Sequence, residues 1–114
     1  MAYDLQLAGK VRAYLAQTPN LQIEEKKMFA GLAFMINGKM CINISGNRLM
    51  IRFDPALTHE LQHKTGYQPM VMKGKVYKGY CYVEPAGFKN KKDFAFWLNQ
   101  GLAFNDVAKS SKKK

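Results

Sequence analysis

The stretch LAFMI-NG-KMCINI, residues 32–44, decides the fold of this 114-residue chain. Asn37-Gly38 stands between two apolar runs, and both central residues of a two-residue hairpin loop need the positive φ that Asn and Gly adopt most readily. The pattern therefore predicts a β-hairpin. The expected cross-strand pairs are Ile36 with Lys39, Met35 with Met40, and Phe34 with Cys41.

Helices and strands can be read outward from this hairpin. Apolar residues recur at helical spacing over residues 3–17 and 91–107, and Trp97 lies on the apolar face of the second segment, where it docks the helix. Before the hairpin, 26–29 is a short candidate strand and Gly31 marks a bend. After it, residues 48–53 alternate as a strand, and Asp54-Pro55 opens a helix that stops at Gly66. Residues 69–76 form a weaker candidate strand and residues 77–83 a better one.

The resulting order of elements is α-β-β-β-α-β-β-α. Because hairpins join most of the strands, we expect an α+β domain with an antiparallel sheet and helices covering one face. Residues 1–108 form this single domain, and residues 109–114 form a basic disordered tail.

Apolar residues occupy both faces of the central strands. If Met35, Met40, Ile42 and Ile44 face the helices, the opposite face carries Phe34, Ile36, Cys41 and Met50. A two-layer domain leaves that second face open, and an open apolar face calls for a partner. We therefore expect a homodimer, the alternative being a helix that folds over this face.

The chain is strongly basic. Lys and Arg number 18 and Asp and Glu number 8, a net charge of +10, and Lys109, Lys112, Lys113 and Lys114 supply four of those charges. No apolar run approaches the roughly 20 residues that span a bilayer, and the N-terminus lacks the pattern of a secretory leader. We expect a cytoplasmic protein without membrane attachment, in which Cys41 and Cys81 are free thiols; a disulfide between two strands is the lesser alternative.

Basic and aromatic residues cluster in two segments. Cations and exposed aromatic rings on strands bind single-stranded nucleic acid through phosphate contact and stacking. A solvated basic sheet edge, which blocks aggregation, is the plainer interpretation. The candidate contact residues for nucleic acid or a protein partner are Arg48, Arg52, Lys73, Lys75, Lys78 and Tyr80.

His59-Glu60-Leu61-Gln62-His63 matches the H-E-x-x-H pattern of zinc hydrolases. Such a site needs a third protein ligand, and the chain has no further histidine. Surface histidines are the favoured interpretation. No nucleophile, catalytic carboxylate pair or phosphate loop is recognisable, so we expect a protein that is not an enzyme and has no cofactor.

Four segments in order resemble the TfoX/Sxy N-terminal domain family. They are MFAGLAFMINGKM (28–40), LMIRFDP (49–55), YKGYCYVEPAG (77–87), and Trp97 with Ala103-Phe104 in the last helix. Ala30 replaces a glycine of the family pattern, and Tyr77 stands where Met is usual. The residues that specify the fold are Met28, Phe29, Gly31, Asn37, Gly38, Gly79 and Trp97.

The resemblance implies a secretion-chaperone-like α+β fold and a regulatory context. Two-domain relatives are linked to natural competence, as co-activators working with the cAMP receptor protein, and the family offers no catalytic residues to carry over. We therefore expect a non-enzymatic interaction module in transcriptional regulation that acts through protein contacts. Direct nucleic-acid binding, including weak binding, is the alternative, and a zinc hydrolase is the remote one.

Overall fold

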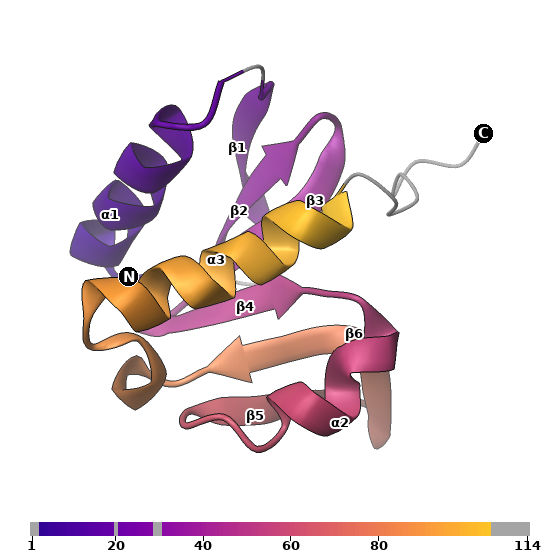
Figure 1. Cartoon of the computed structure of the whole chain (residues 1–114). Helices are drawn as coiled ribbons and strands as arrows, with labels where there is room; N and C mark the ends of the chain where they lie inside the picture. The colour runs from indigo at the N-terminus through magenta and orange to yellow at the C-terminus, as the bar shows by residue number, and fades with distance from the viewer. Residues whose placement is uncertain (1–2, 20, 29–30, 106–114) are drawn as a thin grey trace.

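The computed structural model describes residues 3–19, 21–28 and 31–105, apart from the side chains of Met28 and Met72. Within them, six strands form one antiparallel sheet in the order β1-β2-β3-β4-β6-β5. Figure 1 shows α1 and α3 on the same side of this sheet. The strands are β1 (Ile23–Met28), β2 (Gly31–Ile36), β3 (Lys39–Ser45), β4 (Arg48–Arg52), β5 (Tyr67–Met72) and β6 (Lys75–Val83). The helices are α1 (Leu5–Ala16), α2 (Thr58–Leu61) and α3 (Lys91–Asn105), with 3-10 turns η1 (Pro55–Leu57) and η2 (Pro85–Phe88).

The α+β class and the antiparallel sheet are confirmed, but the strand count is not. Four strands precede the second helix instead of three, because β1 pairs with β2 over its whole length, from Ile23 opposite Ile36 to Met28 opposite Gly31. The sequence of β1, IEEKKM, lacks alternating apolar residues because β1 is an edge strand. Exposed charges suit such an edge, since they discourage pairing with other chains.

The hairpin at Asn37-Gly38 forms as predicted. Asn37 has φ 52° and Gly38 has φ 82°, and Ile36 pairs with Lys39 and Met35 with Met40. The third predicted pair is wrong: Phe34 lies opposite Ile42, because the register shifts between Phe34 and Met35. Cys41 is the extra residue of this β-bulge.

The bulge changes which residues face the helices. Past it, Ile42 and Ile44 point to the helix side as predicted, but Met35 and Met40 point to the opposite face. The core beneath the helices instead includes Phe34, Ile36 and Cys41, which we had expected on the other side. Met50 does lie on the far face, where it packs with Ala33, Met35, Met40 and Met70.

Two of the three predicted helices begin after an aspartate whose side chain caps the first turn. Asp4 Oδ1 accepts hydrogen bonds from the backbone N–H groups of Gln6 (2.8 Å) and Leu7 (3.2 Å), so Asp4 caps α1 from outside its first turn. Asp54 Oδ1 accepts from Ala56 N (3.0 Å), with Pro55 at the first position. The helix predicted from Asp54 to Gly66 is much shorter: η1 leads into the four residues of α2, and Leu61 is its buried residue.

The predicted strands 69–76 and 77–83 are divided at the wrong place. The chain turns at Lys73 (φ 52°) and Gly74 (φ 78°), so β5 ends at Met72 and β6 begins at Lys75. Positive φ at both residues matches a two-residue hairpin turn. Gly79 inside β6 also has positive φ (82°), and its carbonyl accepts a hydrogen bond from Phe53 N (2.8 Å).

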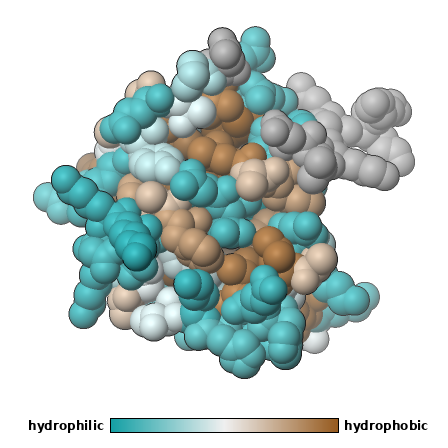
Figure 2. All heavy atoms as spheres, in the orientation of Figure 1, coloured by the Kyte–Doolittle hydropathy of each residue, from teal (hydrophilic) through white to brown (hydrophobic). Residues whose placement is uncertain are grey.

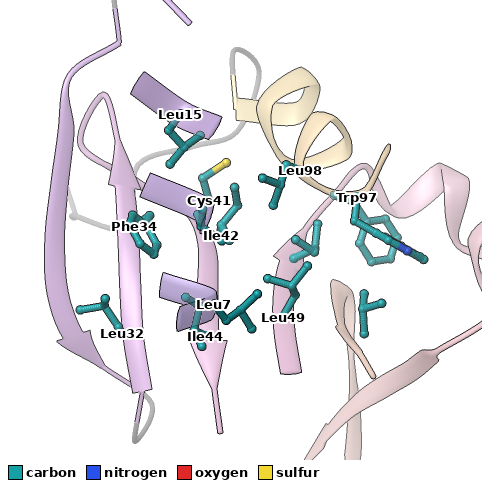
Figure 3. Close-up of a cluster of buried hydrophobic side chains, with 14 of the residues drawn as sticks. Leu7, Leu15, Leu32, Phe34, Cys41, Ile42, Ile44, Leu49, Trp97 and Leu98 are labelled. Atoms are coloured by element: carbon teal, nitrogen blue, oxygen red, sulfur yellow. The ribbon is translucent and has the colours of Figure 1, made fainter. Parts of the chain in front are cut away.

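α3 packs across β3 and β4 and closes the core. The indole nitrogen of Trp97, which is buried, donates to the Gly87 carbonyl (3.1 Å) and so links α3 to η2. Figure 3 shows Leu98 of α3 and Leu15 of α1 lying on either side of Cys41 and Ile42. At the end of α3, Asn105 Nδ2 donates to the Ile36 carbonyl (3.1 Å).

Gly31 is required for space. A Cβ there would collide with the carbonyl oxygen of Ile44 on β3, so β2 begins at a residue without a side chain. Of the two motif residues before Gly31, Met28 ends β1, and Phe29 lies outside the described residues. The predicted boundary at residue 108 and the basic tail 109–114 also lie outside them.

Candidate interaction surface

The end of the β5–β6 hairpin extends beyond the rest of the sheet. β4 pairs with β6 from Arg52 opposite Tyr80 to Leu49 opposite Val83, and no strand of the described residues pairs with residues 75–78 on that side. We call residues 71–78 the ribbon tip. Three apolar side chains of the ribbon tip are exposed: Val71 by 52%, Val76 by 62% and Tyr77 by 42%.

The ribbon tip is also positively charged. Lys73, Lys75 and Lys78 are exposed, and the chain has no acidic residue between positions 66 and 83. Apolar side chains surrounded by ammonium groups form a surface that complements an acidic partner with apolar residues. Three of the six candidate contact residues thus lie together at this tip.

The other three candidates are Arg48 and Tyr80, on the sheet face opposite the helices, and Arg52 at the end of β4, which also lies 5.8 Å from the Phe104 ring centroid of α3. The Arg48 guanidinium stacks on the Tyr82 ring, 3.9 Å from its centroid, and its Nη1 lies 3.7 Å from Glu84 Oε2. Arg52 lies 5.8 Å from the Tyr80 ring centroid. These tyrosine rings face arginines of their own chain, which leaves them less open for stacking by a base.

The apolar residues of this face are already buried. Ala33, Met35, Met40, Met50 and Met70 are each 5% exposed or less, and Tyr80 and Tyr82 pack against them. The open apolar face from which we argued a homodimer is therefore covered by side chains of the same chain. The largest exposed apolar residues described are Leu5, Ile23, Val71, Val76 and Tyr77, three of them at the ribbon tip.

The H-E-x-x-H segment does not form a continuous helix. α2 ends at Leu61, so His63 follows the helix, and both histidines are exposed with ring centroids 5.4 Å apart. Gln62 Nε2 lies 3.3 Å from His59 Nδ1. In the described part of the chain, no three His, Cys, Asp or Glu side chains come together as a metal site would require.

Both cysteines are free and buried in the helix-side core. Burial away from water raises the pKa of the Cys41 thiol to about 12, and burial likewise raises the pKa of the Cys81 thiol to about 12. A nucleophilic cysteine needs a lowered pKa and access to a substrate. These thiols act as core residues.

Reasoning from the sequence located the lysines of the ribbon tip but missed Val71 and Val76. We had placed both inside one strand, 69–76, in which Val71 and Val76 would not lie opposite each other. The pairing of Val71 with Val76 shows that the Lys73-Gly74 turn brings them together. A Lys-Gly pair between apolar residues was the available signal.

These features define a small α+β domain with two helices on one sheet face and a projecting cationic ribbon. The chain belongs to the TfoX N-terminal domain family, whose model matches residues 14–105. No curated protein and no solved structure shows significant similarity to it, so the expected likeness to secretion chaperones stays a prediction. Among the described residues, no helix has the length and apolar character needed to cross a membrane.

Proposed function

We propose that this domain is a non-enzymatic interaction module in transcriptional regulation, which docks through its ribbon tip on an acidic surface of a regulatory protein. The observation that carries the proposal is the exposure of Val71, Val76 and Tyr77 among three lysines. Apolar side chains so exposed lose contact with water when a partner covers them, which stabilises the complex. Family membership supports the regulatory setting through the resemblance described above.

Charge contributes differently from apolar contact in this proposal. The lysines raise the rate of encounter with an acidic partner, whereas burial of Val76 and Tyr77 slows dissociation. Substituting the lysines should therefore make binding less sensitive to salt, and substituting Val76 should weaken it at every salt concentration.

Direct nucleic-acid binding is the second candidate, and the ribbon shape favours it. The major groove of B-DNA accepts a two-stranded β-ribbon, and lysines beside it contact phosphates. The engaged state of Arg48 on Tyr82 makes the sheet face a weaker platform for single-stranded bases. Protein docking remains our first choice, because Val71 and Val76 offer apolar surface that phosphates do not use.

The homodimer is also a proposal, and we assign no surface to it, because the methionine face is buried and the lysines of two ribbon tips would repel each other. A cytoplasmic location and the absence of catalysis likewise stay proposals. The zinc hydrolase receives no support from a third ligand within the described residues.

The test is affinity capture from lysate of the source organism, with and without nuclease treatment, with bait that ends at residue 108. Val76→Ser removes exposed apolar surface at the ribbon tip, and Leu5→Ser is its matched control, because Leu5 is exposed by 63% at the start of α1 and Val76 by 62%. We expect a regulatory protein that the wild type and Leu5→Ser capture and Val76→Ser does not.

Two results would contradict the proposal. Capture that persists with Val76→Ser would show that the ribbon tip is not the docking surface. Capture that disappears on nuclease treatment, with affinity for duplex DNA that falls steeply with salt, would favour nucleic-acid binding. Size-exclusion chromatography with light scattering on the same variants tests the homodimer.

A further inference from the structure

A groove of about 460 Å³ opens between α1 and the start of α3. One wall is a single stripe of α1 that includes Lys10, Ala13 and Tyr14, and the other consists of Phe88 in η2 with Lys89, Lys91 and Phe94. Both helices lie on the same side of the sheet, as Figure 1 shows. The volume lies within the usual range of small-molecule sites.

Three half-buried aromatic rings form the apolar part of the groove. Phe94 is the central ring: it meets Tyr14 edge-on, with centroids 6.1 Å apart at 89°, and lies 6.2 Å from Phe88. The Tyr14 hydroxyl donates to Asn99 Oδ1 (2.7 Å), which holds that ring in place across the two helices. Rings in such arrangements accept a further aromatic ring edge-on or offset.

Three ammonium groups surround these rings. Lys10, Lys89 and Lys91 are exposed, and in the described residues no carboxylate forms an ion pair with any of them. No lining residue of the groove is acidic. In Figure 2, hydrophilic residues project from the side of the molecule where α3 begins.

The nearest carboxylates are engaged elsewhere. Asp93 accepts a hydrogen bond from Asn90 Nδ2 (3.2 Å) at the start of α3. Asp4 lines an adjoining hollow of about 250 Å³ that shares Lys10 and Phe88 with the groove, and its Oδ1 accepts the two N–H groups that cap α1. The charge of the groove itself is therefore positive.

We propose that this groove binds a small organic anion that carries an aromatic ring. The ring packs among Tyr14, Phe88 and Phe94, and the acid group lies toward the ammonium groups of Lys10, Lys89 and Lys91. The site is separate from the ribbon tip, which lies at the far end of the β5–β6 hairpin. A result for or against ligand binding in the groove therefore does not test the proposed function of the ribbon tip.

The test is a titration of the ¹⁵N-labelled protein with 2-naphthoate, followed by ¹H–¹⁵N correlation spectra. We expect saturable shifts concentrated at residues 10–17 and 88–94. Two control compounds separate the contributions: 2-naphthalenemethanol keeps the rings without the charge, and cyclohexanecarboxylate keeps the charge without the aromatic ring. Each should bind about two- to fivefold more weakly, the size of effect that one lost charge or ring contact produces.

Two matched pairs of variants locate the site. Lys91→Glu reverses a lining charge, and Lys92→Glu makes the same change at the next residue, which does not line the groove. Ala13→Glu puts a bulky anion into the α1 wall, and Ala16→Glu does so outside it. We expect about fivefold weaker binding for the first member of each pair and a change below about twofold for the second.

The proposal is overturned if the naphthoate shifts do not saturate, if they centre outside residues 10–17 and 88–94, or if naphthalenemethanol binds as tightly as naphthoate. Equal effects within each pair of variants would also overturn it. All four substitutions are at exposed positions, and thermal unfolding of each variant confirms that the fold is intact.

Discussion

The sulfur of Cys41 lies directly beneath Gly101 of α3. A Cβ at Gly101 would stand 3.1 Å from Cys41 Sγ and 3.3 Å from the Cys41 carbonyl oxygen. Cys41 is the extra residue of the bulge in β3, so the bulge and the glycine fit together where helix and sheet approach most closely. This contact couples the register of the central hairpin to the docking of the last helix.

Gly101→Ala should therefore destabilise the protein, although alanine is the better helix former. Overpacking costs about 1–3 kcal/mol, against a helix-propensity gain of up to about 1 kcal/mol. Gly9→Ala in α1 is the control, because no described atom outside the adjoining backbone of α1 and the two neighbouring residues lies within 4 Å of its Cβ position; it should stabilise by about 0.5–1 kcal/mol. Urea unfolding measures both, and a stabilising effect at Gly101 would contradict the tight contact.

The two thiols should be unreactive in the folded protein. With the pKa of each raised to about 12, the thiolate fraction at pH 8 is about one in ten thousand, and both sulfurs are shielded from solvent. With Ellman's reagent, the protein unfolded in guanidinium at roughly 6 M should rapidly release two equivalents of the coloured thiolate. The folded protein should release them only slowly. Rapid labelling of the native protein would show that the core opens readily.

The ion pair between Arg12 on α1 and Glu25 on β1 should make stability depend on pH. The hydrogen bond from Arg12 lowers the pKa of Glu25 below its ordinary 4.5. A lowered folded-state pKa means that the contribution is present above 4.5 and is lost as the pH falls through the lowered value. Because both side chains are partly exposed, we expect only about 0.5–1 kcal/mol.

Arg12→Gln measures this contribution as a difference in unfolding free energy from the wild type at several pH values. The difference should be largest near neutral pH and approach zero in acid. Arg12→Lys serves as control, because it keeps the charge but loses the two-pronged contact made by Nε and Nη2. If the difference in unfolding free energy grew as the pH fell, the pKa of Glu25 would not be lowered by Arg12 in the folded protein.

The turn of the ribbon tip can be stabilised by a single substitution at Lys73. Lys73 has φ 52°, a left-handed conformation that asparagine adopts at lower cost, as Asn37 does at φ 52° in the other hairpin. Lys73→Asn should stabilise the protein by about 0.5–1 kcal/mol. Lys75→Asn removes the same charge at a strand position and should not stabilise, so equal gains from the two would point to charge rather than turn geometry.

Local chemistry explains most of what the sequence could predict. Asn37-Gly38 sets its own turn, and Asp4 and Asp54 cap the elements that follow them within three residues. Trp97 was recognisable from helical periodicity. Of the candidate surface, the lysines at 73, 75 and 78 were visible because they cluster within six residues.

The rest depended on contacts distant in the sequence. No residue close to Cys41 in the sequence indicates the bulge. The residue that leaves space for Cys41 is Gly101, sixty positions later in the chain. The groove likewise depends on contact between Tyr14 and Phe94, which are far apart in the sequence. Its lining residues come together only because α1 and α3 lie on the same face of the sheet.

The amino-acid sequence by itself determined the Asn37-Gly38 turn, the start of an element after Asp54 and the family, because each rests on residues close together in the chain. Only the tertiary structure decided which side of the sheet each central residue faces. One extra residue in β3 reverses the alternation of side chains, so Met35 and Met40 lie on one face while Ile42 and Ile44 lie on the other. A period of two in the sequence cannot reveal a single inserted residue, because the insertion shows only in how β2 and β3 pair.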